Sequence, residues 1–103
     1  TIARQSPHNL VVIVWDNHQW AETGGQATHT ATGTDLAGVA RASGIRQVAS
    51  VSTLEAFEEA LDRSVASDGP WCIVAEIEEH GHGPRPAVNV EENLLLFRRT
   101  LAD

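Results

Sequence analysis

The sequence predicts an α/β fold in which a parallel β-sheet carries helices on both faces. One observation is a continuous apolar run rich in β-branched residues, Leu10 to Trp15, which is typical of a strand buried on both faces. A second is the order of the segments, because strand-like and helical patterns alternate, and that order predicts parallel strands joined by right-handed crossovers. A third is the length, since 103 residues can bury one small core.

The first strand is followed by a long loop. Asp16 and Asn17 end the apolar run, and from His18 to Thr34 the periodicity disappears while Gly, Thr and Ala accumulate. A connection of this length is uncommon in a small domain unless it is functional or disordered. We therefore expect an irregular, functional loop here.

The next two elements are a short helix and a second strand. Thr34 or Asp35 can cap the helix, which should end before Gly44, a residue suited to the left-handed conformation that follows many helices. Residues 47–51 then form a short strand.

The second helix has the strongest pattern. Ser52 and Glu55 have the Ser-x-x-Glu spacing of a capping box. Apolar residues follow at helical intervals and should face the core: Leu54, Phe57, Leu61 and Val65. Acidic residues occupy the other side and should face solvent: Glu55, Glu58, Glu59 and Asp62.

A third strand is expected at residues 71–77, after the helix-breaking run at 68–70. Cys72 is the only cysteine, so it cannot form an internal disulfide, and we expect a small buried side chain. Trp15 and Trp71 occupy strand positions and are also expected in the core.

The tail, residues 79–103, should contain a loop and a terminal helix that begins near Asn89. Residues 79–86 are rich in Gly, Pro and His. His80 and His82 could approach one metal ion, but no third ligand shares their spacing, so a solvated loop is favoured.

The composition disfavours several function classes. The formal net charge is −7, and the 7 Lys and Arg residues are scattered, which disfavours nucleic-acid binding. The longest apolar run is too short to cross a membrane, and no charged leader precedes it, so a cytoplasmic location is expected. The chain has no Met and opens on a segment typical of the end of a helix, so we expect it to be part of a longer protein.

The loop after the first strand is also where a ligand site is expected, because open parallel sheets bind ligands beyond the carboxyl ends of their strands. The amide oxygen of Asn17 and the loop carbonyls suit a hard cation such as Mg²⁺. Gly24 and Gly25 would let backbone N–H groups approach an anion. Taken alone, however, Asp-Asn after a strand is more often only a turn.

These residues carry a resemblance to a known family. Residues 9–26, together with Thr34-Asp35-Leu36-Ala37 and Ala42-Ser43-Gly44-Ile45, resemble the cofactor-binding domain of thiamine diphosphate-dependent decarboxylases, and the match extends over nearly the whole chain. Thr23-Gly24-Gly25-Gln26 and the tail residues Arg85-Pro86 and Glu91-Glu92-Asn93 are most similar to the phosphonopyruvate and sulfopyruvate decarboxylases. The sequence departs from that branch at Trp20, where Tyr is more common, and at His18-Gln19, which replaces a smaller pair.

The resemblance implies the C-terminal half of a thiamine diphosphate-binding fold, with residues 1–103 as one partial domain. It implies thiamine diphosphate and Mg²⁺ as cofactors, with the side chain of Asn17 and the carbonyl of Gln19 as metal ligands. The family's Gly-Asp-Gly half of the metal site would lie upstream, so this chain would hold half of a diphosphate clamp and be an incomplete enzyme alone. The implied cofactor-binding residues are Asp16, Asn17, Gln19, Trp20, Thr23, Gly24 and Gly25.

No catalytic residue is assigned by the resemblance. His18, Glu22 and His29 lie in the loop and could transfer protons or bind a substrate carboxylate, although exposed loop residues without such a role are commoner. The implied reaction is decarboxylation of a small 2-oxo acid. The implied partner is a pyrimidine-binding domain or subunit, in a homo- or hetero-oligomer.

Two other functions compete with this interpretation. The chain could be a non-catalytic interaction or subunit domain that has the fold but has lost cofactor binding. It could also be a phosphate-binding module with residues 23–26 as an anion loop. The second is disfavoured, because such a loop opens directly into a helix and here about eight residues intervene before Thr34.

Overall fold

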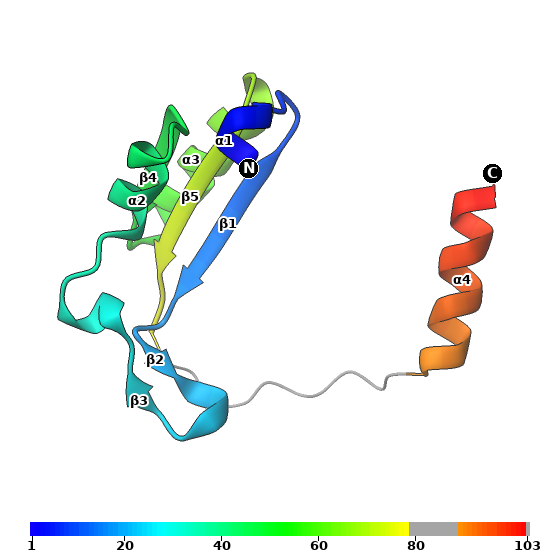
Figure 1. The fold of residues 1–103 in the computed structure, drawn as a ribbon, viewed down its shortest axis with the longest axis horizontal. Helices are drawn as coiled ribbons and strands as arrows, with labels where there is room; N and C mark the ends of the chain where they lie inside the picture. Colours follow the sequence, from blue (N-terminus) through cyan, green and yellow to red (C-terminus); the bar gives the residue numbers. More distant parts are fainter. Residues whose placement is uncertain (79–88, 103) are drawn as a thin grey trace.

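The computed structural model describes residues 1–78 and 89–102. Its centre is a parallel sheet of three strands in the order β1–β5–β4, and Figure 1 shows helices packed against it. The strands are β1 (Val11–Asp16), β4 (Gln47–Val51) and β5 (Trp71–Glu76). Strand β5 lies between the other two and pairs in parallel with both. The predicted α/β class and parallel sheet are confirmed.

Two helices cover opposite faces of the sheet. Helix α2 (Leu36–Ala42) joins β1 to β4, and α3 (Leu54–Ala66) joins β4 to β5. A core cluster packs on the α2 face: Ala37, Ile45, Cys72 and Val74, with Val14 and Val48 against it. Alternate strand residues point to the other face, where the ring of Trp15 lies 5.1 Å from that of Phe57 in α3. Each connection therefore packs its helix on a different face, as expected.

The α3 face has a well-packed centre and an open margin. Ile73 and Ala60 are fully buried, and Trp71 is buried as expected. Trp15, however, is 57% exposed, and two residues expected in the core, Leu54 and Val65, are 68% and 76% exposed. These expectations were wrong because β1 is an edge strand of the described sheet and α3 covers mainly β5 and β4.

The cap of α3 also differs from the expectation. Thr53, not Ser52, is the N-cap residue, and its Oγ1 accepts a hydrogen bond of 3.2 Å from the backbone N–H of Ala56. The acidic residues of α3 are exposed, as predicted. At α2 the cap is Asp35, whose Oδ1 accepts a hydrogen bond of 2.8 Å from the N–H of Gly38.

The assignment of Thr53 as the N-cap residue of α3 can be tested by mutation. Thr53→Ala removes a side-chain acceptor from the first turn of α3 and should lower the free energy of unfolding by about 1 kcal/mol. Ser52→Ala is the matched control, and it should change this free energy by less than about 0.5 kcal/mol because it removes no cap. Urea denaturation of both variants measures the difference. An equal loss in both would contradict the assignment.

The predicted irregular loop contains short regular elements. Strands β2 (Gln19–Trp20) and β3 (Gln26–Ala27) form a small antiparallel ladder, and the 3₁₀ turns η1 (Ala21–Thr23) and η2 (His29–Thr32) follow each strand. Two-residue strands have no detectable hydrophobic period, so the sequence did not reveal them.

Two further helices lie near the ends of the chain. Helix α1 (Ile2–Gln5) contributes Ala3 to the core on the α2 face. Helix α4 (Val90–Ala102) is the predicted terminal helix, and the side chain of Asn89 accepts a hydrogen bond of 3.1 Å from the N–H of Glu92. Figure 1 shows α4 standing clear of the sheet. His80, His82 and Arg85-Pro86 lie outside the described residues. No helix in the described segments is long and apolar enough to span a membrane.

Candidate functional site

The loop from β1 begins at the carboxyl edge of the sheet, as predicted. Asp16 and Glu76 are the last residues of β1 and β5 and are partners in register. A cavity of about 240 Å³ opens at this edge, and its lining includes Asp16, His18, Thr30, Ser50 and Glu76. The edge therefore combines a concave surface with several polar side chains.

Asp16 organises the start of the loop. Its side chain is only 11% exposed, and its Oδ1 accepts two hydrogen bonds, 3.0 Å from the N–H of His18 and 2.7 Å from the hydroxyl of Thr30. The hydroxyls of Thr28 and Thr30 are 2.7 Å apart. Through these bonds Asp16 holds residues 14 positions further along the chain against the end of β1.

His18 has both ring nitrogens near acceptor groups. Its Nδ1 lies 3.2 Å from Thr30 Oγ1 and 3.5 Å from Asp16 Oδ2, and its Nε2 lies 3.5 Å from Glu76 Oε1. The backbone of His18 is left-handed, with φ of 60°, which reverses the chain after Asn17. The ring thus links the loop to β5, an arrangement that suits positioning of the loop better than proton transfer to a substrate.

Asn17 and Gln19, the two expected metal ligands, lie on either side of His18. The N–H of Gln19 donates a hydrogen bond of 3.2 Å to Asn17 Oδ1, and both residues are half-buried. An amide oxygen has a second lone pair, so Asn17 Oδ1 can accept this bond and still bind a cation. Two oxygen ligands suit Mg²⁺, which typically takes few protein ligands and fills its remaining positions with phosphate oxygens and water.

The glycines shape the turn between β2 and β3. Gly24 and Gly25 have φ of 129° and 74°, and a Cβ at Gly24 would come within 2.8 Å of the Gln26 side chain. The N–H of Gly25 donates a hydrogen bond of 2.9 Å to the carbonyl of Trp20, so this donor is already used in the described conformation. Both positions favour glycine because the backbone φ is positive there, a conformation that L side chains rarely adopt.

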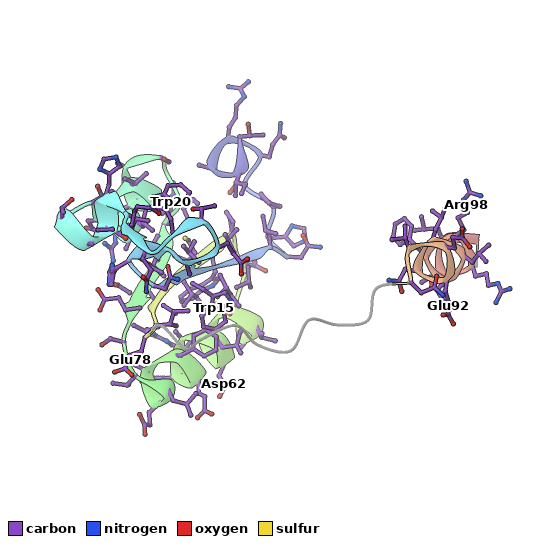
Figure 2. All side chains as sticks on the ribbon, turned by 90° about the horizontal axis from the view of Figure 1, so that it is seen from below. Trp15, Trp20, Asp62, Glu78, Glu92 and Arg98 are labelled. Carbon is purple, nitrogen blue, oxygen red and sulfur yellow. The ribbon has the colours of Figure 1, made fainter. Side chains whose placement is uncertain are left out.

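The remaining predicted residues lie on the exposed side of the loop. Trp20 is 60% exposed at the end of β2, and Figure 2 labels it among the loop elements. Glu22 and Thr23 lie in η1 and His29 begins η2, and all three side chains are exposed. None of these residues lines the 240 Å³ cavity. The structure brings His18 to Asp16 but does not gather the three catalytic candidates there.

Sequence reasoning did not identify two residues of this edge. Thr30 lies in no sequence motif. Its hydroxyl contacts Asp16 only because the loop folds back onto the end of β1. Glu76 could have been found, because it is a charged residue at the end of a buried strand. In the described segments, no group of three or more His, Cys, Asp or Glu side chains could hold a metal ion.

The hydrogen bond from Thr30 to Asp16 should stabilise the fold. Thr30→Val keeps the shape of the side chain but leaves the largely buried Asp16 carboxylate without its 2.7 Å bond, so we expect the free energy of unfolding to fall by about 1–3 kcal/mol. Thr32→Val is the matched control, since the Thr32 hydroxyl makes an exposed bond to the His29 carbonyl. Urea denaturation compares the two, and equal losses would show that Thr30 does not hold the loop.

Comparison with known proteins gives a family match. The family described as "Thiamine pyrophosphate enzyme, C-terminal TPP binding domain" matches residues 1–75. Thiamine pyrophosphate is another name for thiamine diphosphate. Among solved structures, none matches significantly.

The similar curated proteins are decarboxylases. Phosphonopyruvate decarboxylase of Streptomyces viridochromogenes is 40% identical over 101 residues, which covers 95% of this chain and 25% of that protein. The beta subunit of sulfopyruvate decarboxylase from Methanothermobacter thermautotrophicus is 33% identical over 98 residues, covering 95% of this chain and 49% of that subunit. The corresponding subunit from Methanocaldococcus jannaschii is 30% identical over 76 residues, covering 74% and 40%.

The chain thus spans between a quarter and a half of these relatives. The family match includes β1, the loop with Asp16 and Asn17, and nearly all of β5. The resemblance identified from the sequence is confirmed: this chain belongs to the family of C-terminal TPP-binding domains of thiamine pyrophosphate enzymes.

Proposed function

We propose that this chain is part of a thiamine diphosphate-dependent 2-oxo acid decarboxylase and contributes half of its Mg²⁺-diphosphate site. The observation that carries the proposal is the turn at the carboxyl end of β1, where Asn17 Oδ1 is held beside the backbone of Gln19. The side chain of Asn17 and the carbonyl of Gln19 would bind Mg²⁺. The similarity to phosphonopyruvate and sulfopyruvate decarboxylases supports a small 2-oxo acid as substrate.

The outer edge of β1 supports the proposal that another segment supplies the second half of the Mg²⁺-diphosphate site. In the described part of the chain, β1 pairs only with β5, so its other edge carries backbone groups open to a further strand. A strand added there would end beside Asn17. We infer that an upstream segment supplies this strand and the remaining metal ligands.

A pyrimidine-binding domain or subunit would complete the cofactor site. Two of the relatives are named as beta subunits, which supports a hetero-oligomer with a different subunit, and a homo-oligomer is the alternative. The cofactor would supply the thiazolium carbanion and act as the electron sink. We also propose a cytoplasmic location, with neither nucleic acid nor membrane as a partner.

The residues of this chain would bind and orient the cofactor. Asp16 would hold the loop, Gly24 and Gly25 would set the turn, and Thr23 would offer its exposed hydroxyl to the diphosphate. The exposed ring of Trp20 would cover the cofactor or meet a second subunit. Glu22 and His29 stay candidates for proton transfer, whereas His18 would position the loop.

A thermal melt of the full-length protein tests the proposal. At about 100 times its dissociation constant, the cofactor should add roughly 2.7 kcal/mol to the free energy of unfolding. The melting temperature should therefore rise only when thiamine diphosphate and Mg²⁺ are both present, and excess EDTA should reverse the rise. If a folded protein free of cofactor shows no rise, the interaction-domain function replaces this one.

A further inference from the structure

The turn that carries the proposed metal ligands is held by hydrogen bonds from inside and from outside. We call residues 16–19 the metal turn. Inside it, Asp16 Oδ1 accepts a hydrogen bond of 3.0 Å from the N–H of His18, and Asn17 Oδ1 accepts one of 3.2 Å from the N–H of Gln19. From outside it, the N–H of Thr28 donates a hydrogen bond of 2.9 Å to the carbonyl of His18. Thr28 therefore joins the returning loop directly to the backbone of the metal turn.

The bond from Thr28 also sets the direction of the Gln19 backbone. Gln19 faces Ala27 in the β2–β3 ladder, and the bond between Thr28 and His18 flanks this pair. Residues paired in this way direct their N–H and C=O groups away from the partner strand. The N–H of Gln19 accordingly donates to Asn17 Oδ1. Its carbonyl, which is roughly parallel to its N–H in an extended residue, therefore points to the side of the Asn17 amide.

The side chain of Thr28 connects the same point to the end of β1. The Thr30 hydroxyl donates its hydrogen to Asp16 Oδ1 at 2.7 Å, because a carboxylate can only accept. The Thr28 hydroxyl lies 2.7 Å from Thr30 Oγ1, so the hydrogen of this second bond comes from Thr28. The hydroxyl chain therefore runs in one direction, from Thr28 through Thr30 to Asp16. Hydrogen bonds in such a chain strengthen one another.

The burial pattern of the loop singles out the same two residues. From residue 22 to residue 35, every residue is exposed except Thr28 and Thr30, which are half-buried. Partial removal from water strengthens a hydrogen bond, because the local dielectric constant is lower than that of the solvent. The hydroxyl chain is therefore the inward-facing contact of a loop that otherwise lies at the surface.

We propose that Thr28 is a positioning residue for the Mg²⁺ ligands of the metal turn. Its backbone N–H holds the His18 carbonyl, and its hydroxyl keeps that N–H in place by bonding through Thr30 to Asp16. Thr28 acts through the turn and needs no contact with the metal or the cofactor. This inference rests on the proposed function, because it concerns the ligands assigned there, Asn17 and Gln19.

Cofactor titrations of full-length protein variants test this role. Thr28→Val keeps the β-branched shape and the backbone N–H but removes the hydroxyl. We expect the Mg²⁺ concentration for half-maximal binding of thiamine diphosphate to rise roughly 2- to 10-fold, the range for the loss of one neutral hydrogen bond. Thr28→Ser keeps the hydroxyl and should need the same Mg²⁺ concentration as the unchanged protein.

Two further variants complete the design. Thr28→Ala differs from Thr28→Ser only in the hydroxyl, so this second pair should show the same rise and carries the comparison if Thr28→Val does not fold. Thr32→Val is the matched control, since the Thr32 hydroxyl belongs to the same loop but bonds to the His29 carbonyl. It should bind the cofactor like the unchanged protein.

Hydrogen exchange of the cofactor-free protein gives a second readout that does not depend on Mg²⁺. Loss of the Thr28 hydroxyl should speed exchange at the N–H groups of His18 and Gln19 roughly 2- to 10-fold, because the metal turn opens more often. Thr32→Val should leave both rates unchanged. Equal rates in Thr28→Val and the unchanged protein would show that the hydroxyl chain does not hold the turn, and would overturn the inference.

The binding results separate this inference from the proposed function. Unchanged Mg²⁺ dependence in folded Thr28→Val and Thr28→Ala proteins would overturn the inference alone, even if their melting temperatures without cofactor were lower. Binding by Thr28→Ser as weak as that by Thr28→Val would also overturn it, because the hydroxyl would then not be the group that matters. A folded, unchanged protein that binds no cofactor would overturn the proposed function, and this inference with it.

Discussion

Replacing Asn17 by Ala should weaken the Mg²⁺-dependent binding of thiamine diphosphate to the full-length protein by roughly 10- to 100-fold or more. Loss of residues that only support metal ligands typically costs that factor, and Asn17 is proposed as a direct ligand. The fold should survive, because the Asn17 side chain is half-buried and accepts a single hydrogen bond of 3.2 Å, from the N–H of Gln19, among the described residues. Calorimetric titration of the cofactor at fixed Mg²⁺ measures the effect.

Asn17→Asp is the control for this experiment, because it keeps an oxygen at the metal position and should retain Mg²⁺-dependent binding. Circular dichroism and the melting temperature without cofactor show whether either variant is misfolded. Unchanged cofactor affinity in a folded Asn17→Ala protein would contradict the assigned metal ligand. It would leave the family membership intact, since that depends on the match over residues 1–75.

Ile73→Ala should lower the free energy of unfolding by about 2–5 kcal/mol. Ile73 is fully buried at the centre of β5, with Ile13 and Ala49 as its register partners on either side. Truncation removes apolar contacts and leaves a cavity that the neighbouring strands cannot close. Because whole domains are stable by only about 5–15 kcal/mol, this change should be visible as a large shift in the urea midpoint.

Ile2→Ala is the matched control for the core prediction, because the same atoms are removed from a half-exposed residue of α1. It should cost less than about 1.5 kcal/mol. Similar losses of unfolding free energy in the two variants would show that burial in the sheet does not determine how much each truncation destabilises the protein. Cofactor should be absent from both measurements, so that ligand binding does not add to the stability.

The regular elements were predictable because their patterns are local. The apolar run of residues 10–15 predicts β1, and the periodic apolar residues of α3 predict that helix. Neither prediction needs information from the rest of the chain. The position of the site was also predictable, since the carboxyl end of a parallel strand follows from the strand order. Asp16 ends β1 at this edge, as predicted, and the assignment of Asn17 to a ligand site there stays a prediction.

The contacts across the loop were not predictable. Thr30 bonds to Asp16 across 14 positions, and β2 and β3 are too short to show a period. The sequence makes His18 a catalytic candidate, whereas only the folded loop shows that its ring lies beside Thr30 and Glu76. Such contacts depend on how the chain returns to the sheet, which no local pattern encodes.

By itself, the sequence determined the fold class, the family and the place of the candidate site. The order of the strands and helices, the helix periodicity and the Asp16-Asn17 loop motif are all patterns of residues that are close together in the sequence. Only the tertiary structure decided which apolar residues are buried. Trp15 and Trp71 have similar sequence surroundings, yet Trp71 starts the central strand and is buried while Trp15 is exposed on an edge strand. The reason is physical: a side chain is buried by neighbours on both sides, and strand order in space, not in sequence, supplies those neighbours.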